Sequence, residues 1–263
     1  MEATYWFKQT DQAPLFPDML WSRPENKLHA GKLLIIGGNK FHFSAPGLAF
    51  AEAEKTGIGT AKVMLPDVLK KTIGSVLENC EFAPTNKSGG FARNSLGVWL
   101  DNSSWADAVL LAGDVGRNSE TAVVIEEFAR HYDGDLVITQ DCLDQFTTNP
   151  QSIFSRPKTT IVASFGQLQK MWPRLSMGGE VLKFRLPLSQ NLLLMHELTI
   201  TYPVNIITKH NDDMIVSVNG KISTTHNGDE IWRVKTAAHA AVWLLQNPTK
   251  PFEALTTAVN QMD

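Results

Sequence analysis

The sequence of 263 residues lacks the features that mark several classes of protein. Its only cysteines, Cys80 and Cys142, lie far apart and show no ligand spacing, so we expect two buried, reduced thiols and no cysteine metal site. No apolar run reaches the roughly 18 residues that a membrane span requires, and the first residues lack the layout of a signal peptide. We therefore expect a cytoplasmic protein.

A strong charge of one sign is also absent. The sequence has 24 Lys and Arg residues against 27 Asp and Glu residues. No run of basic residues alternates with aromatic residues, as a nucleic-acid-binding surface would require. We therefore expect neither nucleic acid nor a membrane surface as a partner.

The common catalytic and nucleotide-binding motifs are missing as well. There is no Gly-x-x-x-x-Gly-Lys-Ser/Thr segment, and Gly57-x-Gly59 precedes a strand instead of following one. The seven histidines form no His-Glu-x-x-His pair, and no Gly-x-Ser-x-Gly segment occurs. Asp212 and Asp213 could bind a metal, but a turn leading into a hairpin is the favoured interpretation, so we expect no metal site.

Short aliphatic runs alternate with segments of helical periodicity along the chain. This order predicts an α/β fold, a three-layer sandwich in which helices cover both faces of a mainly parallel sheet. The expected strands are residues 33–38, 60–66, 106–113, 135–140, 159–164 and 203–209, and the expected helices are residues 46–57, 67–79, 119–131, 234–247 and 251–261.

The C-terminal part of the sequence departs from this alternation. Asn219-Gly220 separates two short alternating runs, which is the signal for a two-residue type I′ hairpin and predicts an antiparallel edge. No repeat, low-complexity segment or linker interrupts the chain, and 43% hydrophobic residues can fill a sizeable core. We therefore expect residues 1–263 to form a single domain.

Two segments pass from a strand through small residues into a helix. The first runs from Gly37-Gly38 to Pro46, and the second from Ala112 to Glu120. The free N–H groups and partial positive charge of a helix N-terminus suit a phosphate group. A purely structural turn is the favoured interpretation of each segment taken alone, with a phosphate site as the alternative.

The order of several segments resembles the nucleotide-dependent NAD(P)H-hydrate dehydratases, a ribokinase-like family. The resemblance spans nearly the whole chain from about Pro14 and is best in the first third, where His29-x-Gly31-Lys32, Gly37-Gly38 and Ala45-Pro46-Gly47 follow the order of the family. The segments that carry it are "RPENKLHAGKLLIIGGN", "SAPGLAFAEAEKTGIGTAKVMLP", "AVLLAGDVGRN", "DLVITQDCL" and "LLQNPTKPFEAL".

The resemblance implies a function and a set of site residues. Family members use ATP or ADP, with Mg²⁺, to remove water from hydrated nicotinamide and so restore NADH or NADPH, and they often form homo-oligomers. The site is implied at the carboxyl ends of the strands. The implied substrate-binding residues are Gly38, Asn39, Ala45, Gly116 and Ser164, and the implied nucleotide-binding residues are Lys209, His210, Asn211, Asp212 and Asp213.

Several positions depart from the pattern of the family. Asp114 replaces a residue of its Gly-Pro-Gly-Leu-Gly turn, and Lys235 falls where the family has the catalytic aspartate of Gly-Thr-Gly-Asp. A lysine cannot serve as a base unless its pKa is strongly lowered. Asp229, after Gly228, is a possible substitute for the lost aspartate.

These departures leave three functional hypotheses. The first is a divergent NAD(P)H-hydrate dehydratase-like protein. The second is a catalytically inactive nucleotide- or anion-binding or assembly protein of the same fold, for which Arg233 and Lys235 provide a basic helix start. The third is a small-molecule kinase, because ribokinase-like relatives phosphorylate vitamins and sugars. Whether any catalysis remains is the question that separates them.

Overall fold

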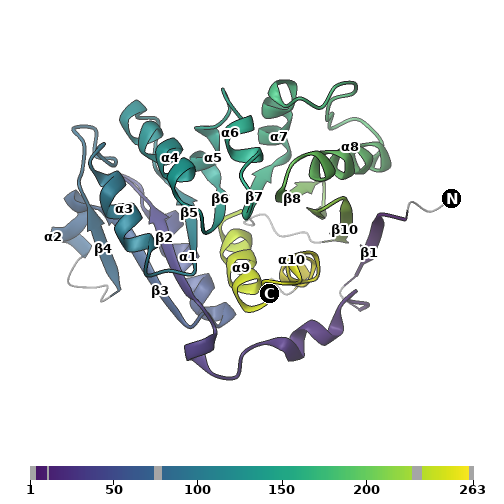
Figure 1. The fold of residues 1–263 in the computed structure, drawn as a ribbon, viewed down its shortest axis with the longest axis horizontal. Coiled ribbons are helices and arrows are strands. Elements are labelled where there is room, and N and C mark those ends of the chain that lie inside the picture. Colours follow the sequence, from purple (N-terminus) through teal and green to yellow (C-terminus); the bar gives the residue numbers. More distant parts are fainter. Residues whose placement is uncertain (1–3, 11, 74–78, 227–232, 261–263) are drawn as a thin grey trace.

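The computed structural model describes residues 4–10, 12–73, 79–226 and 233–260. Within these residues ten strands form one sheet in the order β1-β10-β9-β8-β7-β6-β5-β2-β3-β4 (Figure 1). The strands are β1 (Trp6–Gln9), β2 (Lys32–Gly37), β3 (Thr60–Pro66), β4 (Cys80–Ala83), β5 (Ala108–Gly113), β6 (Asp135–Thr139), β7 (Thr159–Ser164), β8 (Val204–His210), β9 (Asp213–Val218) and β10 (Lys221–His226).

Helices cover both faces of this sheet, which confirms the predicted mainly parallel α/β sandwich (Figure 1). The α-helices are α1 (Ser44–Thr56), α2 (Lys70–Ile73), α3 (Ser95–Ser103), α4 (Ser119–His131), α5 (Gln140–Asp144), α6 (Gln151–Phe154), α7 (Phe165–Met171), α8 (Leu188–Thr201), α9 (Arg233–Gln246) and α10 (Pro251–Asn260). Short 3₁₀ helices are Pro17–Ser22, Lys27–His29, Asp67–Leu69 and Trp172–Arg174.

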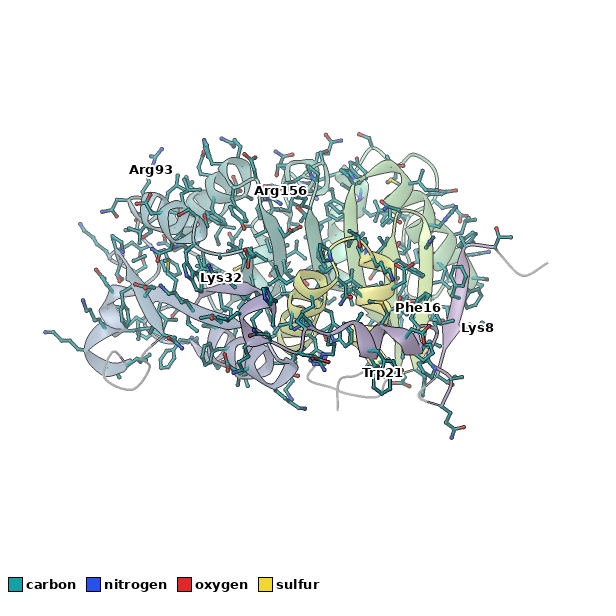
Figure 2. The ribbon with its side chains drawn as sticks, turned by 60° about the horizontal axis from the view of Figure 1, so that its bottom comes forward. Lys8, Phe16, Trp21, Lys32, Arg93 and Arg156 are labelled. Carbon is teal, nitrogen blue, oxygen red and sulfur yellow. The ribbon has the colours of Figure 1, made fainter. Side chains whose placement is uncertain are left out.

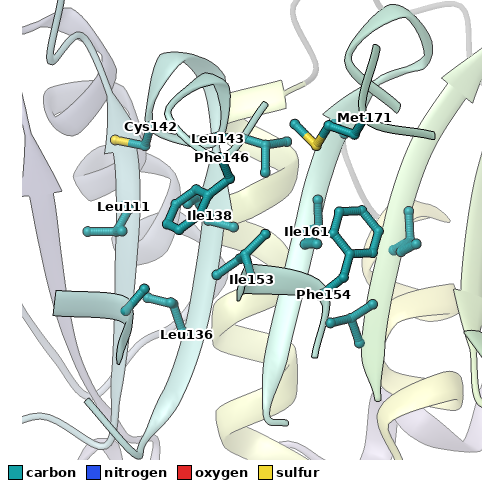
Figure 3. Close-up of a cluster of buried hydrophobic side chains, with 14 of the residues drawn as sticks. Leu111, Leu136, Ile138, Cys142, Leu143, Phe146, Ile153, Phe154, Ile161 and Met171 are labelled. Carbon is teal, nitrogen blue, oxygen red and sulfur yellow. The ribbon is translucent and has the colours of Figure 1, made fainter. Parts of the chain in front are cut away.

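The central strands are apolar on both faces because each face is covered. In β2, Leu34 and Ile36 pack into the core beneath α3–α8, whereas Leu33 and Ile35 pack into the core beneath α1, α9 and α10. Figure 3 shows the first of these cores, with strand residues such as Ile138 packed against side chains from the covering helices. The continuous aliphatic runs of the sequence are therefore explained by burial on two sides.

The predicted hairpin is confirmed, but a strand that we did not predict lies outside it. Asn219 and Gly220 have φ values of 47° and 76°, both positive as a type I′ turn requires. However, β1 pairs in parallel with β10 and forms the edge of the sheet instead. The Trp6 indole donates to Thr224 Oγ1 at 3.0 Å, and such partners more than 200 residues away leave no local pattern.

Two further expectations are met only in part. Of the helix expected over residues 67–79, the structure has the 3₁₀ turn Asp67–Leu69 and α2, and residues 74–78 lie outside the described residues. Both cysteines are free thiols, but only Cys142 is buried, and Cys80 is partly exposed. Burial raises the pKa of Cys80 to about 11, so this thiol stays protonated at neutral pH.

The N-terminal segment crosses the face that carries α9 and α10. Met19 packs with Trp243 and Ala254 there, and the Ser22 hydroxyl donates to Asn247 Oδ1 at 2.8 Å. Figure 2 shows this segment with Phe16 and Trp21 labelled, and Trp21 is 89% exposed. Within the described residues no helix combines the length and the apolar composition that crossing a membrane would require.

Candidate functional site

The carboxyl ends of β2 and β5 approach each other closely through glycines. Gly38 N donates to Gly113 O at 2.9 Å, and a Cβ atom on Gly37 would lie 2.5 Å from the same oxygen. Gly38 and Gly113 also have positive φ values of 84° and 112°. These glycines allow the loops after the two strands to meet at the N-terminus of α1.

Asp114 fills the N-terminus of α1 with its own carboxylate. Its Oδ2 atom accepts a hydrogen bond from Ala45 N at 2.7 Å and another from Ser44 Oγ at 3.1 Å. Its φ value of 60° places it in the left-handed region, which aspartate tolerates better than most residues. The position that suits a bound anion at this helix start is thus held by a side chain of the protein.

Asn39 holds the two loops together. Its Nδ2 atom donates to Asp114 O at 2.6 Å, and its Oδ1 atom accepts from the backbone N–H groups of Phe41 and His42 at 2.8 and 3.2 Å. The side chain is nearly buried. All of these contacts are internal, so Asn39 positions the backbone around Asp114.

A second carboxylate, that of Asp141, accepts hydrogen bonds from the backbone that follows Asp114. Asp141 Oδ2 accepts from Gly116 N at 2.8 Å, and Oδ1 accepts from Val115 N at 3.3 Å. Burial raises the pKa of Asp141, and the nearby charge of Asp114 acts in the same direction, while the two backbone N–H groups act against them. Asp114 of this loop and Asp141 of α5 therefore place two carboxylates near each other at the carboxyl end of the sheet.

A pocket of about 360 Å³ opens beside this loop. The residues that line it come from the loops after β2, β4 and β5 and include Asn39, His42, Ser88, Gly116, Arg117 and Asn118. Asn118 also caps α4, because its Oδ1 atom accepts from Glu120 N at 2.9 Å, while its Nδ2 atom donates to Ser88 Oγ at 3.0 Å. We call this the carboxyl-end pocket.

Ser164 lies at the carboxyl end of β7, where it begins α7. Its hydroxyl accepts from Gln167 N at 3.2 Å, and Gln167 Oε1 accepts from Ser164 N at 3.0 Å, which completes a capping box. Gln167 Nε2 also donates to Asp144 Oδ1 at 2.8 Å. The Ser164 side chain therefore has a structural partner in this arrangement.

The segment from Lys209 to Asp213 forms the tight turn between β8 and β9. His210 is buried, its Nε2 atom lies 3.1 Å from Phe184 O, and its ring packs against Phe165 and Phe184. Asn211 has a φ value of 53°, and Asp213 Oδ1 lies 3.3 Å from His226 Nδ1. The turn thus points the imidazole inward and carries the carboxylates of Asp212 and Asp213, and the nucleotide contacts predicted for this segment stay predictions.

No protein-family model matches the sequence. Among curated proteins, the chain is 26% identical over 125 residues to the bifunctional NAD(P)H-hydrate repair enzyme Nnr of Dictyoglomus turgidum. The matched segment covers 46% of this chain and 24% of that protein. It is 30% identical over 118 residues to the enzyme of the same name from Methanocaldococcus jannaschii, with 43% and 22% covered. The matched part is less than a quarter of the length of these relatives.

Solved structures match over nearly the whole chain. A ribokinase-like superfamily protein of Enterococcus faecalis matches with a TM-score of 0.71 at 16% identity. The match covers 99% of this chain and 87% of the Enterococcus chain. The ADP/ATP-dependent NAD(P)H-hydrate dehydratase of Bacillus subtilis, crystallised with ATP and Mg²⁺, has a TM-score of 0.60 at 13% identity, with 90% and 80% covered.

The fold is ribokinase-like, and part of the sequence is similar to the NAD(P)H-hydrate repair enzymes. The predicted resemblance is therefore confirmed. The contacts predicted for Gly38, Asn39, Ala45 and Gly116 stay predictions, although the structure brings these four residues together around the Asp114 loop. Ser164 lies on β7, two strands away from β5 in the sheet.

Lys235, where the resemblance implies the dehydratase aspartate, lies at the start of α9, and this correspondence stays a prediction. Lys235 is in the first turn of this helix and is partly buried, whereas Asp229 lies outside the described residues. A buried pair holds α9 against α1, because His239 Nε2 lies 3.3 Å from Glu52 Oε1 and His239 Nδ1 lies 3.1 Å from Ala258 O. Burial lowers the pKa of the His239 imidazole.

Sequence reasoning found the Asp114 loop but missed what its carboxylates do. We noted Asp114 as a departure from the dehydratase-like pattern, and we did not single out Asp141 at all. The available signal was an aspartate directly after a buried strand and a glycine, at a place where the chain needs a positive φ. The partner atoms are set by the fold, so this signal alone does not identify them.

Proposed function

We propose that this protein is a dehydratase-like protein that does not repair NAD(P)H hydrates and acts instead as a binding protein for a nucleotide or another anion. The observation that carries the proposal is the Asp114 carboxylate at the N-terminus of α1. An anionic ligand at this place would have to displace a covalently tethered anion. The Asp114 carboxylate competes well with a free anion for these N–H groups, because a tethered group loses little translational and rotational freedom when it binds.

A second feature supports the proposal that the protein does not repair NAD(P)H hydrates. The Asp141 carboxylate occupies the N–H groups of Val115 and Gly116, so two negative charges face any phosphate group that approaches the loop. The repair reaction of the curated relatives acts on a phosphate-rich dinucleotide. This loop therefore opposes the charge of that substrate at the place where the resemblance implies contact.

The start of α9 offers the opposite charge. Arg233 and Lys235 lie in its first turn, where a cation is unfavourable by about 0.3–1 kcal/mol unless an anion binds alongside. We therefore place the anion-binding part of the proposed function at this helix start, with Lys209 at the end of β8 as a further contact. Homo-oligomer formation remains part of the proposal because the resemblance implies it.

The first experiment measures activity directly. We expect no recovery of reduced-nicotinamide absorbance when the protein is incubated with hydrated NADH or NADPH and ATP or ADP in the presence of Mg²⁺. Recovery that disappears in the Asp229→Asn variant would overturn the proposal and identify Asp229 as the acid/base group. Phosphorylation of a vitamin or sugar by the protein would overturn it in favour of kinase activity.

The second experiment measures binding by thermal shift and calorimetry with ATP, ADP, NADH, NADPH and pyrophosphate. Lys235→Ala should weaken binding roughly ten- to a hundredfold, because a charge-assisted contact contributes about 1.5–3 kcal/mol. Lys250→Ala is the matched control, because Lys250 is exposed beyond the end of α9. Unchanged melting curves with every ligand would contradict the binding role.

The third experiment tests the tethered carboxylate. Asp114→Gly keeps a residue that accepts a positive φ and removes the anion from the α1 N-terminus. We expect this variant to gain pyrophosphate binding at least tenfold over the parent protein, whereas Asp133→Gly, at an exposed position, should leave binding unchanged. Equal pyrophosphate affinity in the parent and in Asp114→Gly would show that Asp114 does not block the site.

A further inference from the structure

A second pocket lies at the opposite end of the sheet from the site described above. It has a volume of about 390 Å³ and lies between the amino ends of β5–β8 and the carboxyl end of α9. This volume falls at the lower end of the range of about 300–1,000 Å³ for ligand pockets, so it suits a small molecule. We call it the amino-end pocket.

One wall of the amino-end pocket is polar and held in place. Asn205 Nδ2 donates to Thr160 Oγ1 at 3.1 Å, and Thr160 is only 2% exposed. This bond directs the amide nitrogen of Asn205 toward the protein. Among the described residues none donates to Asn205 Oδ1, so the amide oxygen is left as an acceptor for a ligand.

Two charged side chains of opposite sign lie beside this wall. Asp135 begins β6, and Lys158, with a φ value of 54°, precedes β7 and accepts a hydrogen bond from Leu136 N on its backbone oxygen at 2.9 Å. Neither side chain has an ion-pair or hydrogen-bond partner within the described part of the chain. Each is therefore free to bind a group of opposite charge.

The neighbouring guanidinium does not neutralise Asp135. Arg156 donates to Ala129 O at 3.0 Å, Gly134 O at 2.7 Å and Thr159 Oγ1 at 2.9 Å. Burial raises the pKa of Asp135 even though Lys158 and Arg156 act in the opposite direction. A carboxylate that has lost part of its hydration and has no bonded cation gains most from a ligand that brings one.

The opposite wall is apolar. Ala241, Leu244 and Leu245 of α9 line it together with Pro248 and Pro251, which flank the turn between α9 and α10. Burying an aliphatic or aromatic group against such a wall is favourable by about 25 cal/mol for each Å² removed from water. The pocket thus combines an acceptor, a carboxylate, an ammonium group and an apolar wall.

We propose that the amino-end pocket binds a small apolar α-amino acid. The ammonium group of the ligand binds Asp135 and Asn205 Oδ1, its carboxylate binds Lys158, and its side chain packs against Leu244 and Leu245. A zwitterion satisfies both unpaired charges at once, which neither a simple amine nor a simple carboxylic acid does. This inference does not depend on the anion binding proposed for the start of α9.

Calorimetry and thermal shift with L-leucine and L-phenylalanine test the proposal on the full chain. We expect saturable binding of at least one of the two, and binding at least tenfold weaker for isoamylamine and 4-methylvalerate, each of which lacks one charge. Absence of binding by both amino acids, or equal affinity for the singly charged analogues, would overturn the proposal.

Variants then locate the site. Asp135→Asn and Asn205→Leu should each weaken amino-acid binding about tenfold or more, because the first removes the negative charge that pairs with the ammonium group and the second removes the amide acceptor. Asp133→Asn is the matched control and should bind as the parent does, because Asp133 is exposed two residues away and does not line the pocket. Melting curves confirm that each variant is folded. Folded Asp135→Asn protein that binds with unchanged affinity would refute the assignment.

Discussion

At the carboxyl end of the sheet two carboxylates accept hydrogen bonds from backbone N–H groups, whereas at the amino end one guanidinium donates to backbone carbonyl groups. Asp114 accepts from Ala45 N, and Asp141 accepts from the N–H groups of Val115 and Gly116. Arg156 donates to carbonyl groups near the end of α4 and in the loop before β6. The difference follows from the direction of the helices, which begin at one end of a parallel sheet and end at the other.

The two ends of the sheet carry charged side chains of opposite sign at their helix termini. Free N–H groups of helix starts favour anions, and free carbonyl groups of helix ends favour cations. In both places the protein supplies the matching charge itself. At the carboxyl end this leaves little affinity for a further anion. At the amino end the Arg156 guanidinium is used by backbone carbonyl groups, and Asp135 has no cation bonded to it.

The largest effect should come from removing the guanidinium. Arg156→Met should destabilise the folded state by about 3 kcal/mol or more, because several carbonyl groups lose a charged donor together. Arg156→Lys should recover only part of this loss, since an ammonium group cannot reproduce the planar fork. Urea unfolding gives the free energies. Arg174→Met is the control, because Arg174 is exposed and makes one long hydrogen bond, 3.4 Å to Lys170 O. Equal losses in the two methionine variants would remove any special role for Arg156.

The next largest effect concerns Asp114. Asp114→Ala should destabilise the protein by about 2 kcal/mol, because it loses a helix cap and places alanine, which tolerates the left-handed region less well than aspartate, at a φ of 60°. Asp114→Gly should cost about half as much, since only the cap is lost. Asp114→Asn keeps an acceptor oxygen and should cost least. A different order of the three unfolding midpoints would contradict the capping role.

Tyr132 tests the amino end at high pH. Burial raises the pKa of Tyr132 to about 12 from its ordinary value of about 10. Between pH 10 and pH 12 the unfolded phenol therefore loses its proton before the folded one, and the folded state loses stability as pH rises. The loss should be below about 1 kcal/mol at pH 11, because solvent screens part of the effect. Alkaline unfolding of Tyr132→Phe should lack this loss, whereas Tyr5→Phe, near the sheet edge, should retain it.

The smallest effect is expected for Asp141 at the carboxyl end. Burial raises the pKa of the Asp141 carboxyl group in the folded state. The contribution of this group to stability is therefore fully present at pH values below its pKa in the unfolded chain, and it is lost as the pH rises through its pKa in the folded protein. We expect the stability of the parent relative to Asp141→Asn to fall as pH increases from about 4 toward neutral. Urea midpoints measured across this range give the difference. A relative stability that rises over the same range would show that the two backbone hydrogen bonds outweigh burial.

Much of the fold follows from local sequence patterns. The buried parallel strands were predicted because their aliphatic runs are continuous, and the hairpin was predicted because Asn219-Gly220 accepts two positive φ values. By contrast, β1 and β4 have only four residues each, too few to show a period of two. Their pairing depends on partners elsewhere in the sheet.

The site was predictable only as a region. The order of motifs indicated the loops after β2 and β5, and the structure brings these loops together at the N-terminus of α1. The buried inward orientation of His210 and the capping role of Ser164 were not predictable, because both depend on neighbours from other elements. Those contacts decide which of the implied residues can face a ligand.

The sequence by itself determined the alternation of strands and helices, the left-handed turn residues and the resemblance to NAD(P)H-hydrate dehydratases, because each depends on residues that are close in the chain or on their order. Only the tertiary structure decided which groups fill the helix ends. The Asp114 carboxylate meets an N–H group 69 residues away, and Asp141 meets one 25 residues away. Such pairs form only when the sheet brings its strand ends together, since hydrogen bonds act over about 3 Å and leave no trace in local composition.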